Sequence, residues 1–194
     1  SSGAIGLRIG QGVAIATDGG GIELSGQGNA AAGLVIGDGA SVDAGDSLVV
    51  LRATSAGATD SIDIRGSIRS GVGVNLRPGG VDLQGGLTDA TADSIYLGSG
   101  IGGFVLSDAE LGLIDTPELI IGSNLHAGAI QVLGGISREG NLTLQNGGGS
   151  GGISVQAALD VGDGTLALSS GGSITQTSAG VISAHSLLAQ AGGD

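Results

Sequence analysis

The sequence predicts an all-β fold, a right-handed and three-sided parallel β-helix of about nine coils. Two observations carry this prediction. Short apolar pairs recur at nearly constant intervals over residues 118–190, and turns rich in Gly separate them. Apolar residues with a period of two are typical of short half-buried strands, and a fixed repeat of about 20–50 residues is typical of a solenoid.

The three sides of each coil are predicted from three interleaved ladders of aliphatic residues. All three ladders advance in steps of about 21–24 residues, a length that suits one turn of a solenoid. Coils stacked about 4.8 Å apart would pair the backbone groups of neighbouring strands and bury all three ladders. The ladders are Leu119/Ile121, Leu142/Leu144, Leu166/Leu168 and Leu187/Ala189; Ile130/Val132, Ile153/Val155 and Ile174; and Ile136, Leu159 and Ile182.

We interpret residues 1–194 as a single solenoid segment with four regions. Residues 1–60 show the same pattern with a looser period, residues 61–103 and 118–194 form regular coils, and residues 104–117 are an insertion. In the last region the ladders predict coils of about 21–24 residues. The inward pairs expected in the first region are Ile5/Leu7/Ile9, Val13/Ile15, Ile22/Leu24, Leu34/Ile36 and Leu48/Val50.

Residues 61–103 yield two further register predictions. Val81/Leu83 is expected to stack on Ile62/Ile64 at a step of about 19 residues, with Leu87 on Ile68. Val74/Leu76 is expected to stack on Ile95/Leu97 at a step of about 21 residues. These steps, with those of residues 118–194, predict coils that vary between about 19 and 24 residues because the corner loops differ in length.

The insertion carries the signature of a short helix near residues 107–114. Ser107 and Glu110 have the spacing of a capping box, and Pro117 ends the segment. We interpret it as a structural insertion that shields a strand edge. A local docking feature is the alternative, because Phe104 and four acidic residues gather there: Asp108, Glu110, Asp115 and Glu118.

The composition excludes several classes of function. The chain has a formal net charge of −12, whereas binding to nucleic acid or to anionic lipid needs basic patches. It contains no Cys, which excludes disulfides, thiolate metal sites and a Cys nucleophile. Since no apolar run is long enough to span a bilayer, we expect no membrane insertion. We expect the acidic surface to keep a repetitive molecule soluble.

A carbohydrate-active enzyme is the alternative from another class, because such enzymes also occur among parallel β-helices. A glycosidase needs two carboxylates at a defined separation across a groove. The acidic groups in the chain are Asp38/Asp43/Asp46, Asp60/Asp63, Asp89/Asp93 and Asp160/Asp163. The absence of Lys and the near absence of aromatic residues weaken this alternative. Arg65, Arg69 and Arg77 form the one cluster that could serve it, and we expect them to offset neighbouring acids instead.

We predict no catalytic, cofactor or metal site. Asp38, Asp46 and Asp163 follow Gly in short polar segments, where Asp is a turn former. Weak calcium binding at such an acidic corner is the alternative, although neither the EF-hand loop nor the Gly-rich calcium nonapeptide is present. His126 and His185 lack any metal-ligand spacing and are expected at the surface.

Two segments resemble the repeats of filamentous-haemagglutinin-like large exoproteins. One is the run from Gly171-Gly172-Ser173-Ile174 through Gly180-Val181-Ile182 and Ser186-Leu187-Leu188 to Ala191-Gly192-Gly193-Asp194. The other is Phe104-Val105-Leu106-Ser107-Asp108-Ala109-Glu110-Leu111 leading to Glu118-Leu119-Ile120-Ile121-Gly122. The resemblance covers residues 60–194 and implies a secreted or cell-surface bacterial adhesin, exported through an outer-membrane transporter by two-partner secretion. The amino-terminal secretion domain of that family is not recognisable here.

These observations predict a structural role without catalysis, as the rigid shaft of a filamentous bacterial exoprotein. The expected partners are flanking coils or other copies at the open ends of the β-helix, and receptors or glycans on host or neighbouring cells. A self-assembling extracellular fibre subunit, stacked end to end through uncapped coils, is the alternative within the structural class.

Overall fold

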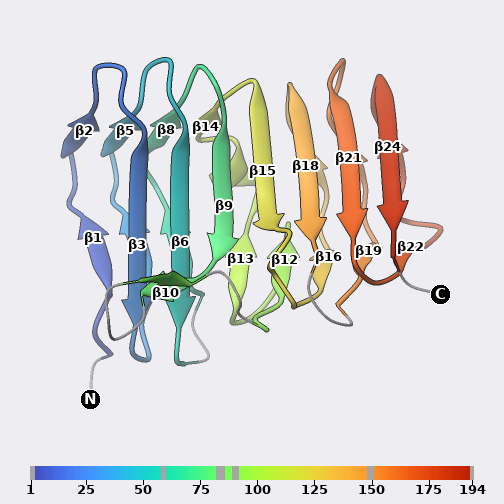
Figure 1. Ribbon diagram of the computed structural model, residues 1–194, viewed down its shortest axis with the longest axis horizontal. Coiled ribbons are helices and arrows are strands. Elements are labelled where there is room, and N and C mark those ends of the chain that lie inside the picture. The colour runs from blue at the N-terminus through green and yellow to red at the C-terminus, as the bar shows by residue number, and fades with distance from the viewer. Residues whose placement is uncertain (1–2, 58–59, 82–85, 89–91, 148–150, 193–194) are drawn as a thin grey trace.

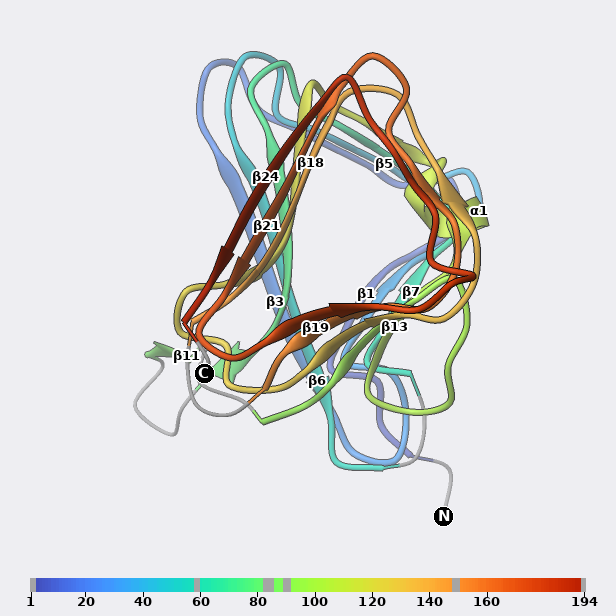
Figure 2. The same cartoon turned by 90° about the vertical axis from the view of Figure 1, so that its right-hand side faces the viewer.

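The protein folds into a parallel β-solenoid whose coils succeed one another along the long axis (Figure 1). The structure is a computed structural model that describes residues 3–57, 60–81, 86–88, 92–147 and 151–192. Viewed along the axis, the coils have a roughly triangular outline and wind in the right-handed sense (Figure 2). The predicted fold class is therefore confirmed.

The first face is a parallel sheet that runs along the whole solenoid. Its seven strands set the number of turns at about seven, fewer than the nine predicted. From the N-terminal to the C-terminal end the strands are β3 (Ile22–Gly28), β6 (Val49–Ser55), β9 (Val74–Pro78), β15 (Glu118–Ser123), β18 (Asn141–Asn146), β21 (Thr165–Ser170) and β24 (Ser186–Ala191).

The other two faces are each divided into two sheets. The second face contains β1 (Leu7–Ile9), β4 (Leu34–Ile36) and β7 (Ile62–Ile64), then β13 (Phe104–Leu106), β12 (Ile95–Leu97), β16 (Ile130–Val132), β19 (Ile153–Val155) and β22 (Ile174–Gln176). The third face contains β2 (Ala14–Ala16), β5 (Ser41–Asp43), β8 (Ser67–Arg69) and β14 (Ile114–Asp115), then β17 (Ile136–Ser137), β20 (Leu159–Asp160) and β23 (Ile182–Ser183). A single short helix, α1 (Asp108–Leu111), is described among these residues and lies at a corner of the triangle (Figure 2).

The three aliphatic ladders of residues 118–190 are confirmed pair by pair. Leu119 stacks on Leu142, Ile130 on Ile153, and Ile136 on Leu159. These side chains point into the interior, where each is at most 2% exposed. Burial of each such side chain contributes roughly 1.5–3 kcal/mol, so the ladders are the main source of stability.

The coils fall into two sizes. Steps between stacked residues are about 25–28 in the N-terminal half and about 21–24 in the C-terminal half, the latter as predicted. Asn75 and Ile120 are stacked neighbours on the first face, yet they lie 45 positions apart in the chain. Wider first coils and this long excursion explain why fewer turns form than the sequence predicted.

Both register predictions for residues 61–103 are wrong. Val81 lies in β10 (Gly80–Val81), which pairs antiparallel with β11 (Leu87–Thr88), and Leu83 lies outside the described residues. Ile68 stacks on Ile114 rather than on Leu87. The strand that starts at Val74 belongs to the first face and the strand that starts at Ile95 to the second. Apolar pairs of the same form occur on every face, so a matching step does not identify the stacking partner.

The predicted inward pair Leu48/Val50 is shifted by one residue. Val49 and Leu51 face the interior and are 0% exposed, whereas Leu48 is 41% exposed. A shift of one position moves every side chain of a strand to the opposite face. The run Leu48-Val49-Val50-Leu51 is apolar throughout, so its period of two is ambiguous in the sequence.

Replacing Ile153 with Asp is expected to lower the free energy of unfolding by about 3 kcal/mol or more, because an uncompensated carboxylate would enter the ladder between Ile130 and Ile174. Ser154 is its outward-facing neighbour, and Ser154→Asp is the matched control, expected to change stability by less than about 1 kcal/mol. Thermal melting followed by far-UV circular dichroism measures both. Equal losses in the two variants would refute the register.

Candidate functional site at the helical joint

The chain reverses its course along the axis between β12 and β13. Although β12 comes first in the sequence, β13 lies on its N-terminal side, because the sheet order is β13, β12, β16. The Ser61 amide, next to β7, donates a hydrogen bond of 2.7 Å to the Gly103 carbonyl, next to β13. The wide and the narrow coils therefore meet at residues 95–115, a region that we call the joint.

The predicted capping box is present at the start of α1. The Glu110 amide donates to the Ser107 hydroxyl (3.2 Å), and the Ser107 amide donates to the Glu110 carboxylate (2.9 Å). Such a cap satisfies backbone groups that a helix leaves unpaired and stabilises it by about 1 kcal/mol. The box fixes the conformation of Glu110, which has a second role.

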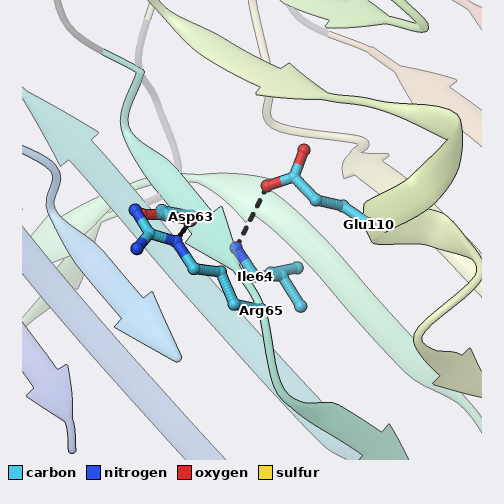
Figure 3. Close-up of polar contacts among 4 residues, drawn as sticks. All are labelled: Asp63, Ile64, Arg65 and Glu110. Carbon is cyan, nitrogen blue, oxygen red and sulfur yellow. Dashed lines mark hydrogen bonds and ion pairs between the residues drawn. The ribbon is translucent and has the colours of Figure 1, made fainter. Parts of the chain in front are cut away.

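Two carboxylates of α1 accept hydrogen bonds from strands on either side of the joint. The Ile64 amide of β7 donates to Glu110 Oε1 (3.0 Å), and the Ser137 amide of β17 donates to Asp108 Oδ1 (2.8 Å) (Figure 3 shows the Glu110 contact). The third face is interrupted here, since β14 and β17 belong to different sheets. Side-chain carboxylates thus replace the strand carbonyls that these amides would otherwise meet. This contact supports the structural interpretation of the insertion.

Arg138 provides a further link on the C-terminal side of the joint. Its guanidinium donates hydrogen bonds to the carbonyls of Thr116 (3.2 Å) and of Asn141. Burial lowers the pKa of Arg138, and the nearby Glu118 carboxylate partly offsets that effect. The ordinary pKa of Arg is so high that the group stays charged at neutral pH.

A hollow of about 520 Å³ lies beside the joint and contains three carboxylates. All three have protein partners: Asp63 pairs with Arg65 through two contacts of 2.9 and 2.6 Å, Asp60 accepts from the Gly102 amide (3.2 Å), and Glu110 caps β7. Figure 3 shows the side chains of Asp63, on the strand that Glu110 contacts, and of Arg65, just after that strand, side by side. The hollow is lined by Ala32, Asp60, Ile62, Asp63, Gly100, Ile101, Gly102 and Glu110.

The structure does not bring the three candidate arginines together. Arg65 follows β7 on the second face, Arg69 ends β8 on the third, and Arg77 lies in β9 on the first. As expected, two of them offset acids, since Arg65 pairs with Asp63 and Arg69 lies 3.8 Å from Asp115. Arg77 is in register with Arg52, and its pKa is lowered by burial and by that second cation, with Glu23 opposing the effect.

The predicted turn aspartates lie in turns or bends, as the sequence indicated. Two neighbours act in the same way, since Asp43 accepts from the Gly45 amide (2.8 Å) and Asp160 from the Gly162 amide (3.0 Å). Asp89 lies outside the described residues. In the part of the chain that the structure covers, no three acidic or His side chains are grouped to hold a metal ion.

The prediction for one of the two histidines is wrong. His185 is exposed as expected, but His126 is 0% exposed. The turn after β15 directs His126 inward, and its amide donates to the Ser123 carbonyl (3.1 Å), while Leu125 is left 59% exposed. The polar character of Asn124 and His126 concealed this inversion in the sequence.

Comparison with protein-family models, curated proteins and solved structures finds no match to this chain. The assignment of the fold therefore rests on strand pairing alone, and the resemblance to filamentous-haemagglutinin-like exoproteins stays a prediction. In the described ranges no helix has the length and apolarity needed to cross a membrane.

Replacing Glu110 with Ala is expected to lower the free energy of unfolding by about 1–3 kcal/mol, because the Ile64 amide and the helix cap lose their acceptor. The protection of the Ile64 amide against hydrogen exchange should fall first. Asp115→Ala removes a carboxylate whose side chain is 86% exposed at the same joint and is expected to have little effect. Unchanged exchange at Ile64 in the Glu110 variant would rule out the bridging role.

Proposed function

We propose that the chain is a rigid, non-catalytic shaft segment of a secreted or cell-surface bacterial exoprotein. The observation that carries the proposal is the seven-stranded sheet, which runs unbroken through the joint while the other two faces are divided. Seven coils about 4.8 Å apart give a rod about 3 nm long. Such a rod holds whatever is attached to its two ends at a fixed separation.

The chemistry of the chain is consistent with export in an unfolded state. It contains no Cys, so no disulfide can form before the chain has crossed a transporter pore. Coils that contact only their neighbours can fold one after another as they emerge. The resemblance to filamentous-haemagglutinin-like repeats points to the same route, with an outer-membrane transporter as a partner during export.

A second candidate is a subunit that stacks end to end. The observation that favours it is the last coil, where β24 is exposed along all six residues. Leu187 and Leu188 are 52% and 63% exposed, whereas Leu166 one coil earlier is 0% exposed. A parallel strand of a flanking coil, or of another copy, would cover both the apolar surface and the open hydrogen-bonding edge.

The shaft proposal is tested by locating the protein in the cells that make it. An antibody raised against the folded chain is expected to label intact cells or to detect the protein in the culture medium. Gold labelling in electron micrographs should place the epitope outside the outer membrane. Label found only after the cells are opened would overturn the proposed location.

The two structural candidates separate in a concentration series of the purified chain. We expect small particles of uniform size in negative-stain electron micrographs at every concentration. Uniform unbranched fibres that lengthen with concentration would favour the stacking subunit. Leu187→Glu should abolish such fibres without changing the circular dichroism of the single chain, because this position is already half exposed.

A further inference from the structure

Charge is distributed unevenly along the solenoid. Residues 119–194 contain one Arg and four acidic residues, whereas the rest of the chain contains five Arg and fourteen acidic residues. Of the charged residues described in the C-terminal part, Arg138 and Glu139 follow β17, Asp160 lies in β20, and Asp163 lies in the turn after β20. All four therefore belong to the third face or its corners. From Leu119 onward, the described outward positions of the first and second faces carry no charge.

On the second face this uncharged surface takes the form of a regular row. Tyr96 is in register with Gln131, Gln131 with Ser154, and Ser154 with Thr175. Their neighbours in β16 and β19 point inward and are at most 1% exposed, so the row points outward. Hydroxyl and amide groups thus recur at the spacing of the coils, about 4.8 Å along the axis.

The row borders a groove of about 330 Å³. The residues that line it include Ala129, Gln131, Gly152, Ser154, Gln156 and Thr175. The side chains of Gln131, Ser154, Gln156 and Thr175 make no hydrogen bond to any other residue that the structure describes. These amides and hydroxyls both donate and accept hydrogen bonds and are available to a ligand.

Tyr96 closes the row at the joint. Its ring lies against the loop that follows β12: a Cβ placed on Gly100 would lie 2.9 Å from the ring Cγ, and one placed on Gly103 would lie 3.5 Å from Cε2. The absence of a side chain at Gly100 therefore leaves room for the ring, which remains half-buried. An aromatic edge at one end of a polar row supplies apolar contact area next to hydrogen-bonding groups.

We propose that this groove binds a neutral polysaccharide chain that lies along the solenoid axis. A polyhydroxylated chain offers donors and acceptors at regular intervals, which matches the repeated amides and hydroxyls of Gln131, Ser154 and Thr175. No charged side chain lines the groove, so it offers no ion pair to a charged ligand. The net charge of −12 also repels an anionic polysaccharide. The inference extends beyond the shaft role, because the shaft itself becomes a binding surface.

Affinity electrophoresis of the purified chain tests the proposal. Native gels are cast with dextran, laminarin, galactomannan or, as the anionic comparison, alginate. We expect retardation in at least one neutral polysaccharide and none in alginate. The chain has one Tyr and no Trp, so its intrinsic fluorescence comes from Tyr96 and should change when the retarding polysaccharide is added. Free migration in all three neutral gels would overturn the proposal.

The triple variant Gln131→Ala, Ser154→Ala, Gln156→Ala should weaken binding at least about tenfold, because three hydrogen-bonding groups are lost. The matched control replaces two Gln and one Ser of the first face, Gln145, Ser169 and Gln190, whose stacked row ends at Gly122 and has no aromatic side chain there. This control should bind like the original chain. An equal loss in both triple variants would refute a site on the second face.

Lateral packing of two copies is the competing use of an uncharged face. In sedimentation velocity, we expect the original chain and the second-face variant to behave as the same species. A dimer that only the second-face substitutions dissociate, together with unretarded migration in the neutral gels, would identify the row as a contact between copies and would overturn polysaccharide binding.

Discussion

The structure depends on one constraint: every coil must satisfy its backbone hydrogen bonds through the next coil. Parallel pairing at about 4.8 Å sets the register, and the register places like residues over one another, as with Leu142 on Leu166. The interior is then filled by Leu, Ile and Val, and Phe104 is the one aromatic side chain buried in the described core. The constraint acts only between neighbours, so stability accumulates coil by coil and no distant contact is needed to hold the fold.

At the joint, the change in coil size interrupts the stacking of strands, and side chains have to replace some backbone hydrogen bonds. Where the wide N-terminal coils give way to the narrow C-terminal ones, the sheets of two faces are interrupted. The first face continues through three residue pairs between β9 and β15. The Ile64 amide there donates a hydrogen bond to Glu110, and the Ser137 amide donates one to Asp108. The Arg138 guanidinium donates to the carbonyls of Thr116 and Asn141. A helix of four residues is too short to be stable alone. Its capping box and its contacts with β7 and β17 stabilise it, so helix and joint depend on each other.

The contrast between regular stacking and the irregular joint explains which features could be predicted from the sequence. The ladders of residues 118–190 were recoverable because strict stacking repeats the same residue types at a near-constant step, and the capping box was recoverable because it is local. The partners of Ile62 and Val74 were not, since the reversal between β12 and β13 is a tertiary arrangement that leaves no period. The inward turn of His126 and the amides bound by Glu110 and Asp108 also depend on tertiary geometry. The uncharged groove could not be predicted from the sequence, because its prediction requires knowing which outward-facing residues of different coils lie side by side.

In such a molecule, binding residues have to lie at positions whose residue type is not determined by the stacking of the coils. Inward positions are committed to aliphatic packing and corners to turns, so only the outward rows can vary without disturbing the register. In the wide half these rows carry acids and arginines that pair locally, as Glu23 does with Arg52 (2.7 Å) and Asp63 with Arg65. From Leu119 onward the described rows of the first and second faces are uncharged, although an acid there would have satisfied solubility equally well. On the second face the amides and hydroxyls stay in register over consecutive coils and the row ends at Tyr96. This combination is better explained by recognition than by solvation, because water requires neither a repeat nor an aromatic surface.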